Sequence, residues 1–334
     1  MSAYSLRNSQ PHLLLVMPSH QLVRKGAELG FRIWSLWDPE QLETDFAPQV
    51  AEASEELLLA DFSDETQLRK TVARTARRHG IDAVLHGGHG NPALPVVREA
   101  WQLGLSTNPP AVYERLQALE GAGHEPASTP RVSVETLTVN GRHHMVGITA
   151  QRTTGAPHFH VTGHLHPAPL TEFERRTIET AVEERLTASG YCSGPAHTLV
   201  ALLPHGPRIL SCRTHLGGDR IPLLVDIAHG FDLEAAVFAD LLGRSPVVPV
   251  AHQYAETGFF LLPEGRLLTY TGTENIAVTP WVRGARFPYS VGNLVASIGD
   301  PRARRAYVVV EGETPEHTRE RIAKARGDLV AEIR

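Results

Sequence analysis

Short apolar runs alternate with helical patterns over the first 110 residues. The run His12-Leu-Leu-Leu-Val16 has few polar positions, as expected for a strand buried on both faces of a parallel sheet. Residues 64–79 have helical periodicity, with Leu68, Val72 and Ala76 on one face. We expect strands at 12–16, 31–37, 57–60 and 81–85, and helices at 64–79 and 94–103. This alternation predicts an open parallel α/β domain.

The pattern changes after residues 120–130, whose Gly, Ala and Pro content is typical of a linker. Polar and apolar positions alternate from Val132 to Val139, Asn140-Gly141 is a strong signal for a two-residue hairpin turn, and a second strand returns over 143–152. Further strands are expected at 159–166, 198–203 and 208–213, and helices at 171–189, 231–242 and 315–325. The second part of the chain is therefore predicted to be α+β.

These patterns predict the domain organisation of the 334-residue chain, which is long enough for two or three domains. We expect an N-terminal open α/β domain over residues 1–110, a linker over 111–131, an α+β core over 132–250 and a C-terminal α+β domain over 251–334. The predicted fold class is α/β followed by α+β.

Composition narrows the classes of function. The hydrophobic fraction of 42%, the charged fraction of 21% and the net charge of −5 are those of a globular protein without the basic excess that nucleic-acid binding needs. No apolar run approaches the length of a membrane span, and Met1–Gln10 lacks the apolar centre of a signal peptide. The two cysteines, Cys192 and Cys212, form no disulfide framework. We therefore expect a cytoplasmic protein that binds neither nucleic acid nor membrane.

Several segments between Val132 and Gly243 resemble the ATP-grasp carboxylate–amine ligases, and in particular their L-amino-acid ligase branch. They are Ser133-Val-Glu135, Gly163-His164 with Pro167-Ala168, Gly194-Pro-Ala-His-Thr198, Leu216-Gly-Gly-Asp-Arg-Ile-Pro222 and Gly230-Phe-Asp-Leu233. Their order and spacing are those of the family. Gly258-Phe-Phe-Leu-Leu-Pro-Glu-Gly265 and Thr314-Pro-Glu316 also look like the last domain of that branch.

The resemblance also implies that this chain lacks one subdomain of the family. The family places a whole subdomain, with lysines and a Gly-rich loop for the phosphates of ATP, where this chain runs from Pro110 to Ser133. The chain has only three lysines, Lys25, Lys70 and Lys324, so this region offers no ammonium group, and arginine is not an equivalent donor. The resemblance therefore implies an ATP-grasp-like fold that lacks the ATP-binding A subdomain.

The hairpin over residues 198–213 departs from the family as well. The two carboxylates that hold Mg²⁺ in the family correspond here to Leu199 and Ser211, an asparagine corresponds to Arg213, and a phosphate-binding arginine corresponds to His215. Mg²⁺ prefers carboxylate oxygens, and phosphoryl transfer depends on metal and cationic groups that spread the charge of the γ-phosphoryl. We interpret the chain as a degenerate member that does not hydrolyse ATP, and we expect neither a cofactor nor a bound metal.

Residues that face the substrate in the family have counterparts in this sequence. Glu135 and His164 match positions that face the amino-acid or acyl substrate in the family, and an Arg guanidinium can bind a carboxylate through two hydrogen bonds. The candidate catalytic residues are His215, Arg213 and Glu135, and the candidate substrate-binding residues are His164, His197, Arg220 and Ser211.

Histidines recur at every second or fourth position from His158 to His166. If one strand ran through them, His158, His160, His164 and His166 would share a face, and imidazoles so placed can bind Zn²⁺. His158, His160 and His166 are therefore weak metal candidates. However, Gly163 would bend the strand, and no nearby Cys or acidic residue completes the set. Surface or hydrogen-bonding histidines are favoured.

Three functions are compatible with these residues. The first is an ATP-independent, repurposed ATP-grasp protein that acts on or binds an amino-acid- or peptide-derived small molecule in specialised-metabolite biosynthesis. As an enzyme it would be a cyclase, isomerase or hydrolase. The alternatives are a non-catalytic partner of an active ligase, or an ATP-dependent amino-acid ligase with an atypical nucleotide site. Because a lost subdomain leaves a surface to cover, a homodimer is also expected.

Overall fold

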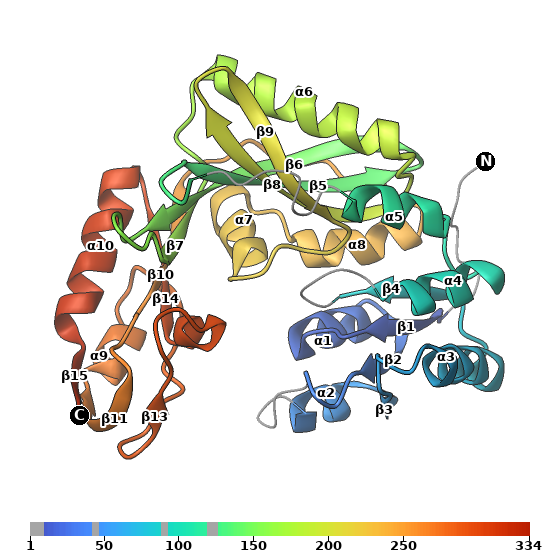
Figure 1. Ribbon diagram of the computed structural model, residues 1–334, viewed down its shortest axis with the longest axis horizontal. Helices are drawn as coiled ribbons and strands as arrows, with labels where there is room; N and C mark the ends of the chain where they lie inside the picture. The colour runs from blue at the N-terminus through green and yellow to red at the C-terminus, as the bar shows by residue number, and fades with distance from the viewer. Residues whose placement is uncertain (1–9, 42–46, 88–92, 119–125) are drawn as a thin grey trace.

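The computed structural model describes residues 10–41, 47–87, 93–118 and 126–334 (Figure 1). A small parallel sheet with its helices forms the N-terminal part, a large antiparallel sheet forms the centre, and a smaller sheet lies near the C-terminus. Within the described residues, no helix is both long and apolar enough to cross a membrane.

The N-terminal part is the predicted open α/β domain. Its four strands pair in parallel in the order β3-β2-β1-β4. They are β1 (His12–Val16), β2 (Arg32–Trp37), β3 (Glu56–Leu59) and β4 (Ala83–His86). The helices are α1 (His20–Glu28), α2 (Ala47–Ala53), α3 (Glu65–His79), α4 (Leu94–Gln102) and α5 (Pro110–Gln117). The apolar run of β1 is buried on both faces of the sheet, as its sequence predicts.

One eight-stranded sheet forms the centre, in the order β12-β14-β10-β7-β6-β5-β8-β9. Its strands are β5 (Arg131–Val139), β6 (Arg142–Thr153), β7 (Val161–His166), β8 (Gly194–Leu203), β9 (Gly206–Arg213), β10 (Tyr254–Phe259), β12 (Val282–Arg286) and β14 (Tyr307–Gly312). Because β7 pairs with β10, the sheet runs across the boundary that the sequence pattern places at residue 250. The hairpin turn at Asn140-Gly141 is confirmed, with φ of 52° and 77°.

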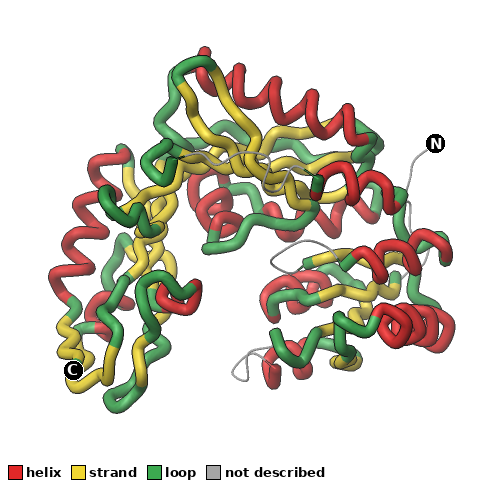
Figure 2. The backbone as a smooth tube through the Cα atoms, viewed as in Figure 1, coloured by secondary structure: helices red, strands yellow, loops and turns green. Residues whose placement is uncertain are grey.

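Helices cover both faces of this sheet (Figure 2). On one face, α6 (Glu172–Ser189) packs through Ile178, Val182 and Leu186, and α5 packs through Val112 and Leu116. On the other lie α7 (Ile221–His229) and α8 (Leu233–Leu241), whose axes are visible beneath the strands in Figure 1. The sequence pattern predicts α6 and α8 but not α5 or α7. The Ile221-Pro-Leu-Leu-Val stretch of α7 shows no polar face, because the helix is buried on several sides.

The remaining elements complete the C-terminal part. They are a three-stranded sheet in the order β13-β11-β15, formed by β13 (Leu294–Val295), β11 (Gly265–Thr271) and β15 (Val330–Ile333), with α9 (Thr273–Ala277), the 3₁₀ helix Pro301–Arg305 and α10 (Pro315–Asp328). The predicted final helix is confirmed by α10. Only residues 118–130 connect α5 to β5, and the described ones among them form no helix or strand.

A continuous hydrophobic cluster joins the N-terminal part to the centre. Phe238 of α8 packs on Phe31 with ring centres 5.4 Å apart, and it also lies against Gly26 of α1. A Cβ atom at Gly26 would come within 2.4 Å of the Ile33 side chain and within 2.8 Å of the Phe238 ring, so a larger residue there would force these side chains to move. Lys25, one of three lysines, lies at the edge of the contact, with its Nζ 2.7 Å from Asp232 and 2.9 Å from Glu234.

Two histidines are paired beneath the sheet. His166 of β7 and His229 of α7 have their Nε2 atoms 2.9 Å apart. The Nδ1 of His229 lies 2.7 Å from the carbonyl oxygen of Pro249, which can only accept, so this nitrogen donates. The Nε2–H of His166 therefore donates to His229, and the Nδ1 of His166 accepts from the Thr149 hydroxyl at 2.9 Å. This chain of hydrogen bonds uses two neutral imidazoles.

Acid should destabilise the protein through this pair. Burial, with a smaller contribution from His229, lowers the pKa of His166 to about 3, whereas an unfolded histidine titrates near 6.5. Since the unfolded chain binds more protons, the stabilisation is complete above about pH 6.5 and is lost as the pH falls, by about 1.4 kcal/mol per pH unit for each proton taken up.

Urea unfolding of the His166→Gln variant between pH 7.5 and 4.5 tests this expectation. The variant should lose stability less steeply with falling pH than the parent. His205→Gln, which removes an exposed histidine in the turn between β8 and β9, is the matched control and should keep the parent slope. Equal slopes for His166→Gln and the parent would contradict the assignment.

Candidate functional site

A large cavity, about 420 Å³, lies where three parts of the chain meet. The N-terminal sheet contributes the residues that follow β1 and β4 and the end of β2, including Met17, Trp37 and Gly87. This position, outside the carboxyl ends of parallel strands, is where open α/β sheets bind ligands. The turn at Leu216–Leu223 and the C-terminal part supply the other walls. The volume is that of a site for a small molecule.

The turn that borders the cavity is fixed from behind by Glu135. This carboxylate is 1% exposed and accepts a hydrogen bond from the Gly217 N–H at 3.2 Å. A Cβ atom at Gly217 would come within 2.9 Å of both carboxylate oxygens, so the turn needs glycine there. The next residues, Asp219 and Arg220, have φ of 52° and 71° although neither is glycine. Such left-handed backbone persists only where surrounding contacts hold it.

Asp219 is held by two basic side chains. The Nε2 of His164 lies 3.1 Å from its carboxylate, and a guanidinium nitrogen of Arg304 lies 2.5 Å from the same oxygen. His164 is buried on β7, and Arg304 comes from the 3₁₀ helix Pro301–Arg305. Asp219 therefore links the central sheet to the C-terminal wall of the cavity.

Glu135 also forms a buried pair with His197. The Nδ1 of His197 lies 2.6 Å from the second carboxylate oxygen of Glu135. Burial opposes the charged imidazolium, but the charge and hydrogen bond of Glu135 outweigh it and raise the pKa of His197. His215 stacks on His197 with ring centres 6.2 Å apart, and its Nδ1 lies 2.6 Å from the carbonyl oxygen of Leu216. These residues form a buried layer behind the Leu216–Leu223 turn.

The cavity wall includes only one of the seven predicted site residues, Arg220. His164 does not line the cavity but contacts Asp219, which does. Glu135 likewise contacts Gly217, which lines the cavity. His197, Ser211, Arg213 and His215 lie outside its lining, on β8, on β9 and in the segment after β9. Their catalytic or substrate-binding roles stay predictions.

The histidine repeat does not lie on a single strand. β7 begins at Val161, and Phe159 has a left-handed φ of 50°, so the period of two is interrupted before the strand starts. His158 and His160 stack on each other at 5.4 Å, whereas His166 contacts His229. Across the described ranges, no group of three or more His, Cys, Asp or Glu side chains is placed to hold a metal ion.

The two cysteines have the character of buried thiols. Burial raises the pKa of Cys212 to about 11 and also raises that of Cys192. Both groups are therefore protonated at neutral pH and are poor nucleophiles.

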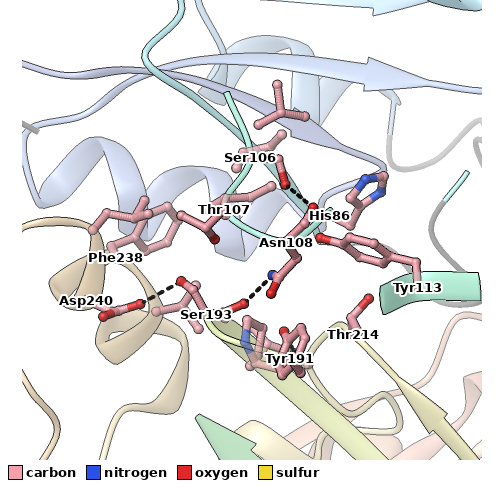
Figure 3. A pocket seen from close by; sticks show the side chains of 18 of the residues that line it. His86, Ser106, Thr107, Asn108, Tyr113, Tyr191, Ser193, Thr214, Phe238 and Asp240 are labelled. Atoms are coloured by element: carbon pink, nitrogen blue, oxygen red, sulfur yellow. Dashed lines mark hydrogen bonds between the residues drawn. The ribbon is translucent and has the colours of Figure 1, made fainter. Parts of the chain in front are cut away.

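A smaller cavity of about 50 Å³, lined by both polar and apolar side chains, lies near the large one (Figure 3). Leu22 and Leu216 line both cavities and separate them. In Figure 3, the polar ends of Asn108, Tyr113 and Thr214 face a common space. The volume suits a few water molecules rather than an organic ligand.

Two titratable groups line this small cavity. Burial raises the pKa of Asp240 to about 6, and burial followed by the charge of His215 lowers the pKa of His86 to about 4. Both groups are thus shifted toward their neutral forms, as expected for titratable groups that burial removes from water.

Sequence reasoning missed most of the cavity wall. Arg286, Arg304 and Arg305 are far from Arg220 in the chain and meet it only in the folded protein. The Arg-rich segment Pro301–Arg305, which the sequence analysis did not single out, is a local signal that could have pointed to a cationic surface.

Comparisons with known proteins place the fold. Residues 258–334 match the family described as L-amino acid ligase C-terminal domain 2. The crystal structure of L-amino acid ligase from Bacillus licheniformis has a TM-score of 0.83 and 15% identity, and the match covers 99% of this chain and 100% of that one. Phosphoribosylglycinamide synthetase from Anaerococcus prevotii has a TM-score of 0.78 and 10% identity, with 98% and 100% covered.

Two further matches extend the comparison. The biotin carboxylase domain of 2-oxoglutarate carboxylase from Hydrogenobacter thermophilus, described as a dimer in complex with MgADP, ADP and bicarbonate, has a TM-score of 0.68 and 11% identity, with 96% of this chain and 90% of that chain covered. A protein of Sinorhizobium fredii described as uncharacterized protein y4rH is 26% identical over 250 residues, or 71% of this chain. This chain spans about half the length of that relative, of which the match covers 50%.

Removal of the buried carboxylate should destabilise the protein strongly. The Glu135→Ala variant leaves His197 without its ionic partner and the Gly217 N–H without its acceptor, so the free energy of unfolding should fall by about 3–5 kcal/mol. The pKa of His197, followed by NMR, should fall where the variant remains folded. Glu184→Ala, on the exposed side of α6, is the control and should change stability by less than about 0.5 kcal/mol. A loss below about 1 kcal/mol for Glu135→Ala would contradict its role behind the turn.

Proposed function

From the premise that this chain has the ATP-grasp fold and ends in a domain of the L-amino acid ligase type, we propose that it works without ATP. In this proposal it binds an amino-acid- or peptide-derived anion in the 420 Å³ cavity, and it serves the biosynthesis of a specialised metabolite.

The main support for the proposal is the identity of two facing side chains at the centre of the β8–β9 hairpin. Leu199 and Ser211 are directly opposite each other in the register, where the family resemblance implies two carboxylates for Mg²⁺. Neither side chain supplies the anionic oxygens that Mg²⁺ prefers. Arg213, which pairs with His197 across the same strands, adds a positive charge that opposes a cation.

The cavity supports the binding half of the proposal. Arg220, Arg286, Arg304 and Arg305 line it and suit a carboxylate, because a planar guanidinium offers two parallel N–H groups. Asp219 and Glu234 line it too, and an ammonium group there would share Asp219 with His164 and Arg304 and share Glu234 with Lys25.

We favour binding over catalysis at this site. The candidate catalytic residues Glu135, Arg213 and His215 lie outside the cavity lining, so a ligand there meets the turn that Glu135 and His215 contact rather than these side chains themselves. Should the protein catalyse a cyclisation, isomerisation or hydrolysis, the turn would have to move to expose them.

Titration of the full chain with ATP and Mg²⁺ tests the proposal that the protein works without ATP. Isothermal calorimetry should give no binding tighter than a Kd of about 1 mM, because the hairpin offers no carboxylate at either metal position. A parallel titration with Mg²⁺ alone separates metal binding from nucleotide binding. A micromolar Kd for ATP would overturn the proposal and favour the atypical ligase instead.

We also expect a homodimer. Leu268, Leu294 and Val330 of the β13-β11-β15 sheet are 48%, 72% and 50% exposed, and a second copy would cover them. Light scattering at micromolar concentration should give twice the chain mass of 36.5 kDa. Leu294→Asp should shift the protein toward the monomer, whereas Leu59→Asp, at an exposed position of β3, should not. A parent protein that is monomeric at these concentrations would contradict the expectation.

A further inference from the structure

The large cavity also has an apolar wall, which comes from the N-terminal part of the chain. This apolar wall consists of Met17, Pro18, Leu22, Trp37 and Val50. Met17 and Pro18 follow β1, Leu22 lies in α1, Trp37 ends β2, and Val50 lies in α2. The arginines of the cavity come instead from the segment before α7 and from the C-terminal part. A ligand in the cavity therefore meets a carbon surface as well as charged groups.

Part of the apolar wall is fixed by packing. Leu22 and Val50 are buried and belong to the hydrophobic cluster that joins the N-terminal part to the centre. Gly87 packs directly against the same wall, because a Cβ atom there would come within 2.6 Å of the Leu22 side chain and within 3.2 Å of the Pro18 backbone. Side chains packed at this density have little freedom to move, so this part of the wall has one shape.

Met17 is an accessible member of the wall, and its backbone is strained. The residue is half-buried, and its φ is 53° although it is not glycine. Its N–H donates to the carbonyl oxygen of Leu36 at 2.7 Å, which holds this conformation at the end of β1. Strained backbone of this kind clusters at ligand sites. The unbranched Met17 side chain can also adapt its shape to an apolar group beside it.

Trp37 presents carbon to the cavity. Its indole is half-buried, and its Nε1–H donates to the carbonyl oxygen of Pro18 at 3.2 Å. Because the indole has only this one polar atom, the rest of the ring has no hydrogen bond to offer a ligand. A flat apolar group suits such a surface, since two aromatic rings attract each other beyond the effect of the area that they bury.

The other aromatic rings of the cavity lining are already covered by cations. The Arg220 guanidinium lies 4.8 Å from the centre of the Tyr307 ring, and the Arg304 guanidinium lies 5.8 Å from that of Phe259. Within the described part of the chain, neither a second ring nor a cation stacks on Trp37. Trp37 is therefore the aromatic ring of this cavity that is open to a ligand.

We propose that the apolar wall is the side-chain pocket of the ligand site, and that it selects an amino-acid-derived carboxylate whose aromatic side chain stacks on Trp37. The side chain lies between Met17 and Trp37, and Arg220 binds the carboxylate through its planar guanidinium. The inference concerns the side chain alone, because ligands with the same head group meet the same charges in the cavity. It rests on the proposed function, since it assumes that the cavity is the ligand site.

Calorimetric titration of the full chain with ligands that share one head group tests the inference. Alanine, leucine, phenylalanine and tryptophan carry the same charges and differ in their side chains, and their N-acetyl derivatives repeat the series without the ammonium group. In the head-group series that binds, we expect the two aromatic members to bind at least tenfold more tightly than alanine, with leucine between them. The reason is that an aromatic side chain buries more apolar surface and also stacks.

Variants locate the two ends of the ligand. Trp37→Ala should reduce the aromatic preference to less than threefold, whereas Trp37→Phe should keep most of it. Arg220→Gln should weaken the binding of every member of the series by a similar factor. Trp101→Ala, at a 43% exposed position of α4 outside the cavity lining, is the matched control and should leave every affinity unchanged. Thermal unfolding of each variant shows that it is folded.

A crystal of the parent protein soaked with 4-iodophenylalanine or its N-acetyl derivative gives a readout that needs no variant. The anomalous signal of the iodine atom marks the position of the aromatic side chain. It should lie beside the Trp37 indole, in the space that Met17 also borders. An iodine atom bound elsewhere in the cavity would overturn the assignment of the side-chain pocket.

The outcomes separate the inference from the function beneath it. If alanine binds as tightly as phenylalanine and both depend on Arg220, the aromatic pocket is overturned and the cavity remains the ligand site. The same holds if the aromatic preference persists in a folded Trp37→Ala variant. If no member of either series binds, or if binding is unaffected by Arg220→Gln, both proposals are overturned.

Discussion

The contact between Phe238 of α8 and Gly26 of α1 is the one on which the rest of the structure depends. It joins the N-terminal sheet to the central sheet through a single hydrophobic cluster, and the ion pairs of Lys25 lie at its edge. The two walls of the large cavity come from opposite sides of this contact. Their separation, and hence the size of any ligand between them, is therefore set by the close approach of two helices rather than by the residues that touch the ligand.

A second constraint acts from within the central sheet. Glu135 is buried between His197 and the Gly217 N–H, and a buried carboxylate is costly unless it is paired and hydrogen-bonded. The protein gains from it a defined backbone path at Leu216–Arg220, including two left-handed residues that would otherwise relax. The residues that the family resemblance singles out thus shape the cavity from behind, while arginines from the C-terminal part form its surface.

Local patterns in the sequence predicted most of the strands and the longer helices, because burial on one or two faces leaves a clear period. Asn140-Gly141 was sufficient to predict a hairpin, since few residue pairs adopt its positive φ angles. The helix α7 escaped prediction because its buried faces leave no polar stripe. The arginine wall escaped it because Arg220, Arg286 and Arg304 are brought together only by long-range pairing. The histidines of 158–166 do not share one strand, since Phe159 has a left-handed φ before β7 begins, and the favoured interpretation of hydrogen-bonding or surface histidines did not depend on that period.

The pairing of β7 with β10 has a consequence for how the chain is made. β7 ends at His166 and β10 starts at Tyr254, so the first strand leaves the ribosome well before its neighbour exists. At a synthesis rate of roughly 5–20 residues per second, that delay is on the order of 4–18 s. During this interval the growing sheet has an unpaired edge, and the nascent chain depends on chaperones or on its own helices to keep that edge from pairing with a neighbouring polypeptide.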